Sequence, residues 1–283
     1  MIALLSTNFF RIRRDLLFWL ALCVCLVGGI AFGMGFRGTP AFDDFYAFPF
    51  FVALCAFLSL FLGREYGDGT LRNKVTAGYR RGQIYLAYLL ASLTVGLLFL
   101  AAFLLPFVVM NAAALAPLGA KVLGPALVGM VLLCAALVAL FTAISCCVSL
   151  WVVGALANLG LWFFLMFGAY QIEFALGQPA YVTELYTDAQ GRVQEEETTP
   201  NPHYLGGTLR VVAEGVDACL PNGQMNHLVS YLTTCLSLQE NGLDPEAAEL
   251  YEEVHFRDPL CALAVTAGVT AVGLTVFRKK DLK

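Results

Sequence analysis

The chain has 283 residues, of which 59% are hydrophobic and 13% are charged, and its formal net charge is −4. Soluble domains carry roughly 25% charged residues, so this composition excludes an ordinary water-soluble domain. The apolar residues gather in long uncharged blocks, which is typical of a chain that crosses a membrane several times.

The first 14 residues are too short to cross a bilayer, and their apolar side chains alternate with polar and basic ones. This pattern favours an amphipathic helix over residues 1–14 that lies in the headgroup region. The alternative is a frayed tail whose arginines only orient the chain. The apolar run that follows exceeds a typical signal-peptide core, and no Ala-x-Ala site comes after it, so we expect an uncleaved first span.

The uncharged blocks predict an all-α polytopic fold with six transmembrane helices. A hydrocarbon core about 30 Å thick needs ~20 apolar residues in a helix. The block 122–172 is too long for one span, so it must hold two, with a turn near 145–149. The predicted spans cover about residues 16–36, 45–63, 83–110, 122–145, 150–170 and 259–277.

Three basic clusters orient these spans: residues 11–14, 64–81 and 278–283 hold 12 of the 17 lysines and arginines. An even number of spans separates the clusters, so all three can lie on the cytoplasmic side, as the positive-inside rule prefers. We therefore expect a multi-pass protein of the cell membrane with spans one to five over 15–170, and span six with a basic cytoplasmic tail over 258–283. Both termini would be cytoplasmic.

Small residues in two spans have the spacing that permits close helix packing. Gly29 and Gly33 form such a pair in the first span, and Ala264 and Gly268 do so in the sixth. Small residues four apart let two helices approach closely in lipid. Chance is the alternative, because glycine and alanine are common in membrane helices.

The largest polar segment, residues 171–257, predicts an extracellular subdomain with 14 acidic residues and three arginines. We expect a mobile loop over 183–201, a short helix over 226–238, and a further helix that starts at Asp244-Pro245 and runs through Phe256.

Two cysteines, Cys219 and Cys235, lie in this external segment. A disulfide between them would persist outside the membrane. The alternative is two free thiols. The other seven cysteines lie mostly in apolar blocks, where we expect them to act as small packing residues.

Residues 64–82 form a short, basic loop punctuated by glycines, with a helix predicted over 70–77. Asp68 or Thr70 is placed to cap that helix, and the glycines on either side permit sharp turns. Such an element can press into a groove on a cytoplasmic partner. The alternative is a loop that merely satisfies the positive-inside rule.

This loop resembles the connection between the second and third spans of type-2, exporter-type ABC transporter permeases. In that family a Glu follows the second span, then Gly-Thr-Leu-Arg, then an Arg before the third span. The chain matches with Glu65, with Gly69-Thr70-Leu71-Arg72, and with Arg80 or Arg81. It departs from the pattern where the family usually has a Ser or Thr before the last Arg.

Two further stretches resemble the same family. The chain ends with Gly273, a spaced Phe277, basic residues and Asp281-Leu282, and a Leu220-Pro221 element precedes the last span. The resemblance covers the order of the spans along the whole chain. Each stretch alone is weak, whereas their order and spacing together are more specific.

The resemblance implies that residues 70–77 form a coupling helix that docks on a separate ABC ATP-binding subunit. The implied coupling residues are Glu65, Gly69, Thr70, Leu71, Arg72 and Lys74. The chain lacks a Gly-x-x-x-x-Gly-Lys-Ser/Thr loop, so ATP and Mg²⁺ are expected in the partner and no cofactor or catalytic residue in this chain. The other expected partners are a second or related permease and the lipid membrane, with no nucleic acid.

The uncharged spans favour export of a hydrophobic or amphipathic cargo, such as a peptide, an antimicrobial or a lipid, over ion-coupled transport. Two alternatives come from other classes. Glu252-Glu253 with His255 and Arg257 resembles a motif of intramembrane metalloproteases, although no histidine follows His255 and we expect no metal site. A peptide-sensing or immunity subunit that does not transport is the second alternative.

Overall fold

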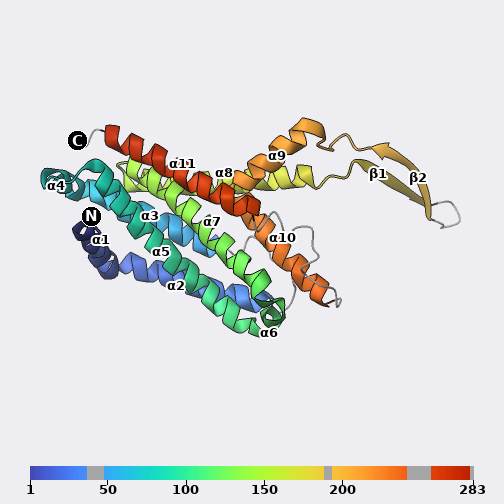
Figure 1. The fold of residues 1–283 in the computed structure, drawn as a ribbon, viewed down its shortest axis with the longest axis horizontal. Coiled ribbons are helices and arrows are strands. Elements are labelled where there is room, and N and C mark those ends of the chain that lie inside the picture. The colour runs from blue at the N-terminus through green and yellow to red at the C-terminus, as the bar shows by residue number, and fades with distance from the viewer. Residues whose placement is uncertain (37–47, 188–192, 241–255, 281–283) are drawn as a thin grey trace.

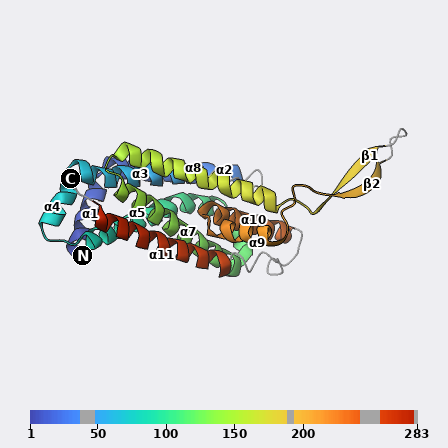
Figure 2. The ribbon, with the colours of Figure 1, turned by 90° about the horizontal axis from the view of Figure 1, so that it is seen from above.

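The computed structural model describes residues 1–36, 48–187, 193–240 and 256–280, which form an elongated helical bundle with a β-hairpin projecting from one end (Figure 1). The N-terminus, the short helix α4 (Thr70–Thr76) and the C-terminal end of the last helix lie together at the opposite end, here called the α4 end. The view in Figure 2 shows the same arrangement of the two ends.

Six described helices are long and apolar enough to cross a membrane, as predicted, so the fold is that of a multi-pass α-helical membrane protein. Several extend beyond the predicted spans at one or both ends. The helices are α2 (Leu16–Phe36), α3 (Phe48–Gly67), α5 (Arg81–Met110), α7 (Gly119–Cys147), α8 (Trp151–Leu176) and α11 (Asp258–Lys279).

The first 14 residues form the predicted helix, α1 (Ile2–Arg14), with three arginines in its last turn. Cations there interact favourably with the negative end of the helix dipole. The Asp15 carboxylate then accepts a hydrogen bond from the Leu17 backbone N–H at 3.0 Å, at the start of α2. Asp15 thus separates two helices that would otherwise be continuous.

The predicted turns also appear between the long helices. The segment after α5 holds only α6 (Ala112–Leu115) and η2 (Ala116–Leu118). The predicted turn near 145–149 falls between the end of α7 and the start of α8.

The hairpin corrects the prediction of a mobile loop over 183–201. Strands β1 (Tyr181–Thr187) and β2 (Val193–Pro200) pair antiparallel, with an irregularity between Thr183 and Leu185. The prediction gave weight to the acidic residues of this stretch and too little to its threonines, tyrosines and valines, which favour strands. The fold is therefore mainly, but not purely, α-helical.

Two helices follow the hairpin: α9 (Gly207–Cys219) and α10 (Pro221–Glu240). Helix α10 includes the predicted helix 226–238 and is longer at its N-terminal end. It packs against α7, and its buried side chains form a second apolar cluster with the segment around α6. The helix predicted to begin at Asp244 lies outside the described residues, except for its last residue, Phe256.

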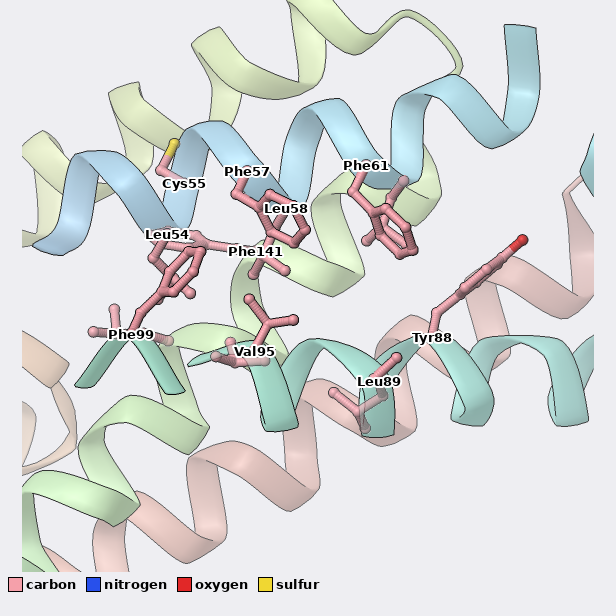
Figure 3. Close-up of a cluster of buried hydrophobic side chains, with 14 of the residues drawn as sticks. Leu54, Cys55, Phe57, Leu58, Phe61, Tyr88, Leu89, Val95, Phe99 and Phe141 are labelled. Atoms are coloured by element: carbon pink, nitrogen blue, oxygen red, sulfur yellow. The ribbon is translucent and has the colours of Figure 1, made fainter. Parts of the chain in front are cut away.

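The main core lies between α2, α3, α5 and α7, with α8 against α3. Figure 3 shows part of it, in which Phe57 and Phe61 of α3 face Val95 and Phe99 of α5. The rings of Phe57 and Phe61 stack with centroids 5.6 Å apart. Aromatic pairs at this separation add to the free energy gained from burial.

One predicted small-residue pair lies at a close helix crossing. A Cβ atom placed on Gly29 would fall 2.1 Å from the carbonyl oxygen of Phe103 on α5, and one on Gly33 would fall 3.1 Å from Met110 Sδ. Only glycine at position 29 allows this approach of α2 to α5. Gly268 has no such neighbour within 4 Å, so this member of the pair predicted in the sixth span does not lie at a close crossing with a described helix.

An uncharged polar cluster joins three helices inside the bundle. The Asn158 amide on α8 donates hydrogen bonds to Ser59 Oγ at 2.8 Å and to Ser145 Oγ at 2.9 Å. It also reaches the Phe141 carbonyl oxygen at 3.3 Å. Such bonds join α3, α7 and α8 where no water competes.

Candidate coupling site at the α4 end

Helix α4 is bounded by two glycines with left-handed backbone. Gly69 has φ +66° and Gly78 has φ +86°, a conformation that glycine adopts without steric cost. This agrees with the predicted sharp turns. The predicted cap is wrong, because Gly69 is the N-cap and neither Asp68 nor Thr70 caps the helix through its side chain. The Thr70 hydroxyl instead donates to Glu65 Oε2 at 2.5 Å.

Glu65 is the centre of the site and is fully buried, with 0% of its surface exposed. Its Oε1 is paired with the guanidinium of Arg11 on α1. Its Oε2 accepts hydrogen bonds from Lys74 Nζ at 3.0 Å and from the Tyr88 hydroxyl at 2.9 Å. One carboxylate at the end of α3 therefore links α1, α4 and α5.

Lys74 ties α4 to the same helices by further bonds. Its ammonium group donates to Asn8 Oδ1 on α1 at 3.2 Å and to the Tyr88 hydroxyl on α5 at 3.1 Å. Burial lowers the pKa of Lys74, and the neighbouring Glu65 carboxylate opposes that change. We call Asn8, Arg11, Glu65, Thr70, Lys74 and Tyr88 the Glu65 cluster.

The predicted coupling residues divide between two faces of α4. Leu71 is only 3% exposed and packs into the main core, on the same side as Lys74. Arg72 lies on the exposed face, together with Asn73 and Thr76. A partner can therefore reach Arg72, whereas Glu65 and Leu71 serve to hold the helix in place.

Sequence reasoning missed three members of the Glu65 cluster, Asn8, Arg11 and Tyr88. The sequence pattern predicts only a topogenic or headgroup role for Arg11, and Tyr88 lies in an uncharged span. The spacing of Leu71, Lys74 and Val75 indicates that these three side chains lie on one face of α4, because residues three and four apart share one face of a helix. No local pattern indicated the contact between Glu65 and Arg11, which are 54 positions apart.

The basic C-terminal end of α11 lies next to this site. The Arg81 guanidinium donates to the carbonyl oxygens of Arg278 at 3.0 Å and of Lys280 at 2.5 Å. The Lys280 ammonium lies 4.1 Å from the centre of the Tyr66 ring. Burial lowers the pKa of Lys280. The two stretches that resemble the permease family thus meet in space, as far as residues 64–81 and 273–280 are described.

A second buried charged cluster lies at the hairpin end. His227 on α10 contacts Asp217 of α9 through Nε2 at 3.0 Å and Asp258 of α11 through Nδ1 at 2.8 Å. Burial alone would lower the pKa of His227, but hydrogen bonds to the two carboxylates outweigh it and raise the pKa to about 10. The imidazole is therefore charged at neutral pH and joins three helices. We call these three residues the His227 cluster.

The structure does not join the two cysteines for which a disulfide was considered. Cys219 and Cys235 are both free thiols; Cys235 is buried in the apolar cluster around α10, and Cys219 is exposed at the end of α9.

The residues behind the protease alternative are mostly outside the described part of the chain. This applies to Glu252, Glu253 and His255. Arg257 is described, and its Nε lies 3.7 Å from Asp258 Oδ1. Within the described ranges, no group of three or more His, Cys, Asp or Glu side chains is arranged to hold a metal ion.

An apolar cavity of about 60 Å³ lies between α2, α3, α5, α7 and α10. Its walls include Phe32, Phe103, Met130 and Leu228. Pockets for drug-sized ligands measure roughly 300–1,000 Å³. This cavity is therefore too small for a cargo of that size in the described conformation.

The fold and its buried charged clusters define the class of this protein as a multi-pass α-helical membrane protein. No family model matches the chain, and neither does any curated protein or solved structure.

Proposed function

We propose that this chain is the membrane-spanning permease subunit of an ATP-driven ABC-type transporter, with α4 as its coupling helix. The observation that carries the proposal is the anchoring of α4 through the Glu65 cluster. A loop that only satisfied the positive-inside rule would need no such bonds to other helices. Here a seven-residue helix is bonded to α1, α3 and α5 through one buried carboxylate.

This arrangement suits the transmission of force from a partner. A protein bound to the exposed face of α4 would act on a helix that is tied to three others, so its movement would be shared by them. Interactions between buried charges resist separation, because each group left alone in the interior is costly. In the proposed assembly the ATP-binding subunit supplies ATP and Mg²⁺ chemistry, and two permease chains line the pathway.

The interior favours an apolar or amphipathic cargo. The buried polar cluster around Asn158 inside the bundle is uncharged. The apolar cavity of about 60 Å³ has no room for such a cargo, so passage requires the helices to move apart. This requirement fits alternating access, in which ATP binding by the partner drives that movement. Export and a location in the cell membrane with both termini cytoplasmic complete the proposal.

The test is ATP hydrolysis by the purified complex of this chain with its ATP-binding subunit. Replacing Arg72 and Thr76 on the exposed face with Glu should reduce permease-dependent hydrolysis by about tenfold or more, since loss of ~1.4 kcal/mol of docking free energy gives that factor. Arg210→Glu at the hairpin end is the matched charge reversal and should leave hydrolysis unchanged.

Leu71 is not a suitable test position, because an aspartate there would disrupt the core rather than the docking face. Normal hydrolysis by a folded Arg72→Glu, Thr76→Glu variant would contradict the assignment of α4. Peptide cleavage by the purified chain without any ATP-binding subunit would instead favour the protease alternative.

A further inference from the structure

A groove lies between α1 and α2, near the point where the chain turns from one helix into the other (Figure 1). Its volume is about 350 Å³, which is within the range of roughly 300–1,000 Å³ found for ligand pockets. Its lining combines one charged side chain with apolar and aromatic ones from α1, α2 and α5, among them Phe9, Arg13, Phe18, Trp19, Leu22 and Leu98.

The walls of this groove are held in place by contacts within the chain. The Phe18 ring is buried and stacks on Phe99 of α5, with centroids 5.8 Å apart. The Trp19 indole N–H donates to the carbonyl oxygen of Arg13 at 3.0 Å, which joins the first turn of α2 to the last turn of α1. Trp19 and Leu98 are 49% and 47% exposed. The groove is therefore preformed, and its apolar wall is open to lipid.

Arg13 gives the groove a positive charge that no acidic side chain compensates. Arg11, on the same turn of α1, is paired with Glu65, and Arg64 is paired with Asp15. Arg13 is exposed and has no carboxylate partner among the residues that the structure describes. A ligand that fits this groove would combine an apolar chain with a negatively charged group, because such a molecule matches both parts of the lining.

A second groove, of about 330 Å³, lies on the opposite side of α1 and is less suited to an anion. Its charged side chains are those of three arginines and two aspartates: Arg11, Arg14, Arg64, Asp15 and Asp68. Two of its arginines are already paired with carboxylates. An anion there would face like charges, whereas the groove that contains Arg13 has no acid in its lining.

We propose that the groove between α1 and α2 is a binding site for one anionic phospholipid. An acyl chain lies against Phe18, Leu22 and Leu98, and the phosphate lies at the Arg13 guanidinium. Basic pockets beside membrane helices bind anionic headgroups in this way, and tryptophan is typical of the membrane interface where headgroup and chain meet. The proposal depends on the membrane setting of the fold and not on any partner of α4.

The experiment is a lipid titration of the full chain, purified in non-ionic detergent and freed of bound lipid. Dioleoyl phosphatidylglycerol and dioleoyl phosphatidylcholine are added separately, and bound molecules are counted by native mass spectrometry. We expect the first phosphatidylglycerol to bind about fivefold more tightly than the first phosphatidylcholine, the factor contributed by one basic residue near an anionic lipid. Arg13→Gln should remove this preference and leave the affinity for phosphatidylcholine unchanged.

Arg14→Gln is the matched control, because it removes the same charge from the same turn but lines the second groove. It should retain the preference for phosphatidylglycerol. Equal affinity of the wild type for the two lipids would overturn the inference. Equal losses in Arg13→Gln and Arg14→Gln would also overturn it, because the attraction would then come from the overall charge of α1.

A second variant tests the apolar part of the site. Leu98→Trp should fill the groove and weaken the binding of both lipids about tenfold, the factor expected when about two methylene groups are excluded. Leu97→Trp is its control, because Leu97 is exposed on the same helix but does not line the groove. Unchanged binding by Leu98→Trp would contradict the proposed position of the acyl chain.

A competition experiment separates a lipid from a soluble phosphate as the ligand. Glycerol 3-phosphate carries the phosphate but no acyl chain, so an excess of it should not displace bound phosphatidylglycerol. Displacement would show that the site recognises the phosphate alone and would overturn the assignment to a lipid.

Discussion

The two ends of the bundle each bury a charged cluster, and the clusters have opposite compositions. At the α4 end one carboxylate, Glu65, is held by two cations, Arg11 and Lys74. At the hairpin end one imidazole, His227, is held by two carboxylates. The stability of the Glu65 cluster depends on the presence of every charged partner. The second depends on the protonation of a single ring, which makes it sensitive to pH.

Among the substitutions that test this comparison, removal of Glu65 should have the largest effect on the stability of the protein. Glu65→Ala leaves Arg11 and Lys74 without their shared counter-ion, and breaking a buried pair costs about 3–5 kcal/mol. We expect the free energy of unfolding in detergent to fall by that amount, and α1 to become sensitive to protease.

The matched control is Asp15→Asn. Asp15 is paired with Arg64 at the surface at 3.2 Å, and an asparagine retains the oxygen that caps α2. Exposed pairs contribute about 0–1 kcal/mol. Equal stability of Glu65→Ala and Asp15→Asn would show that the Glu65 cluster does not anchor α4.

Loss of the His227 ring should destabilise the protein in a pH-dependent way. The pKa of His227 is raised from 6.5 to about 10, so its contribution is fully present below pH 6.5 and is lost as the pH rises through about 10. The facing groups are Asp217 on α9, with Asp258 and the neighbouring Arg257 at the start of α11. We expect the free energy of unfolding of the wild type to exceed that of the His227→Gln variant by about 2 kcal/mol at pH 6. This difference should shrink toward pH 10.

The measurement is thermal unfolding of both proteins across that pH range. His203→Gln is the control, because His203 is exposed on the loop before α9. A difference between wild type and His227→Gln that did not change from pH 6 to pH 10 would contradict a charged imidazole in the His227 cluster.

A smaller effect should follow from crowding the same cluster without changing its charge. Gly223→Ala would place a methyl group 2.4 Å from Asp217 Oδ1, so either α10 or Asp217 must move. Overpacking of this kind costs about 1–3 kcal/mol. Gly215→Ala on α9 meets nothing within 4 Å and should be neutral or gain up to about 1 kcal/mol. Unfolding in detergent measures the stability of both variants. Equal stability of Gly223→Ala and Gly215→Ala would mean that the close approach of α10 to Asp217 is not required.

The smallest effect is expected at the uncharged cluster between the two ends. Asn158→Ala leaves the hydroxyls of Ser59 and Ser145 without their shared donor, which costs about 0.6–2 kcal/mol in a membrane helix bundle. Thr94→Ala is the control, because the Thr94 hydroxyl donates to the Leu90 carbonyl of its own helix at 3.0 Å and joins no second helix among the described residues. Identical unfolding of the two variants would show that the Asn158 bonds do not stabilise the bundle.

Much of the fold could be predicted because the bilayer fixes the length of a span and excludes charge from it. The six long helices, the turn after α7 and the glycine-bounded α4 all follow from such local signals. The hairpin was missed because its acidic residues suggested a solvated loop, while strand pairing depends on two segments meeting. The site was only partly predictable, because Glu65 and Lys74 carry a recognisable pattern but Tyr88 and Arg11 enter through tertiary contacts.

The positions of the two charged clusters along the chain have a consequence for biosynthesis. Every member of the Glu65 cluster precedes residue 89, whereas every member of the His227 cluster follows residue 216. Because chains emerge from the ribosome N-terminus first, the α4 anchor can assemble as soon as α5 has left the tunnel. The opposite end must wait for Asp258 and the insertion of the last helix. A prematurely terminated chain would thus already contain the complete Glu65 cluster but would lack the contacts of the His227 cluster, and this difference would distinguish unfinished copies from complete ones.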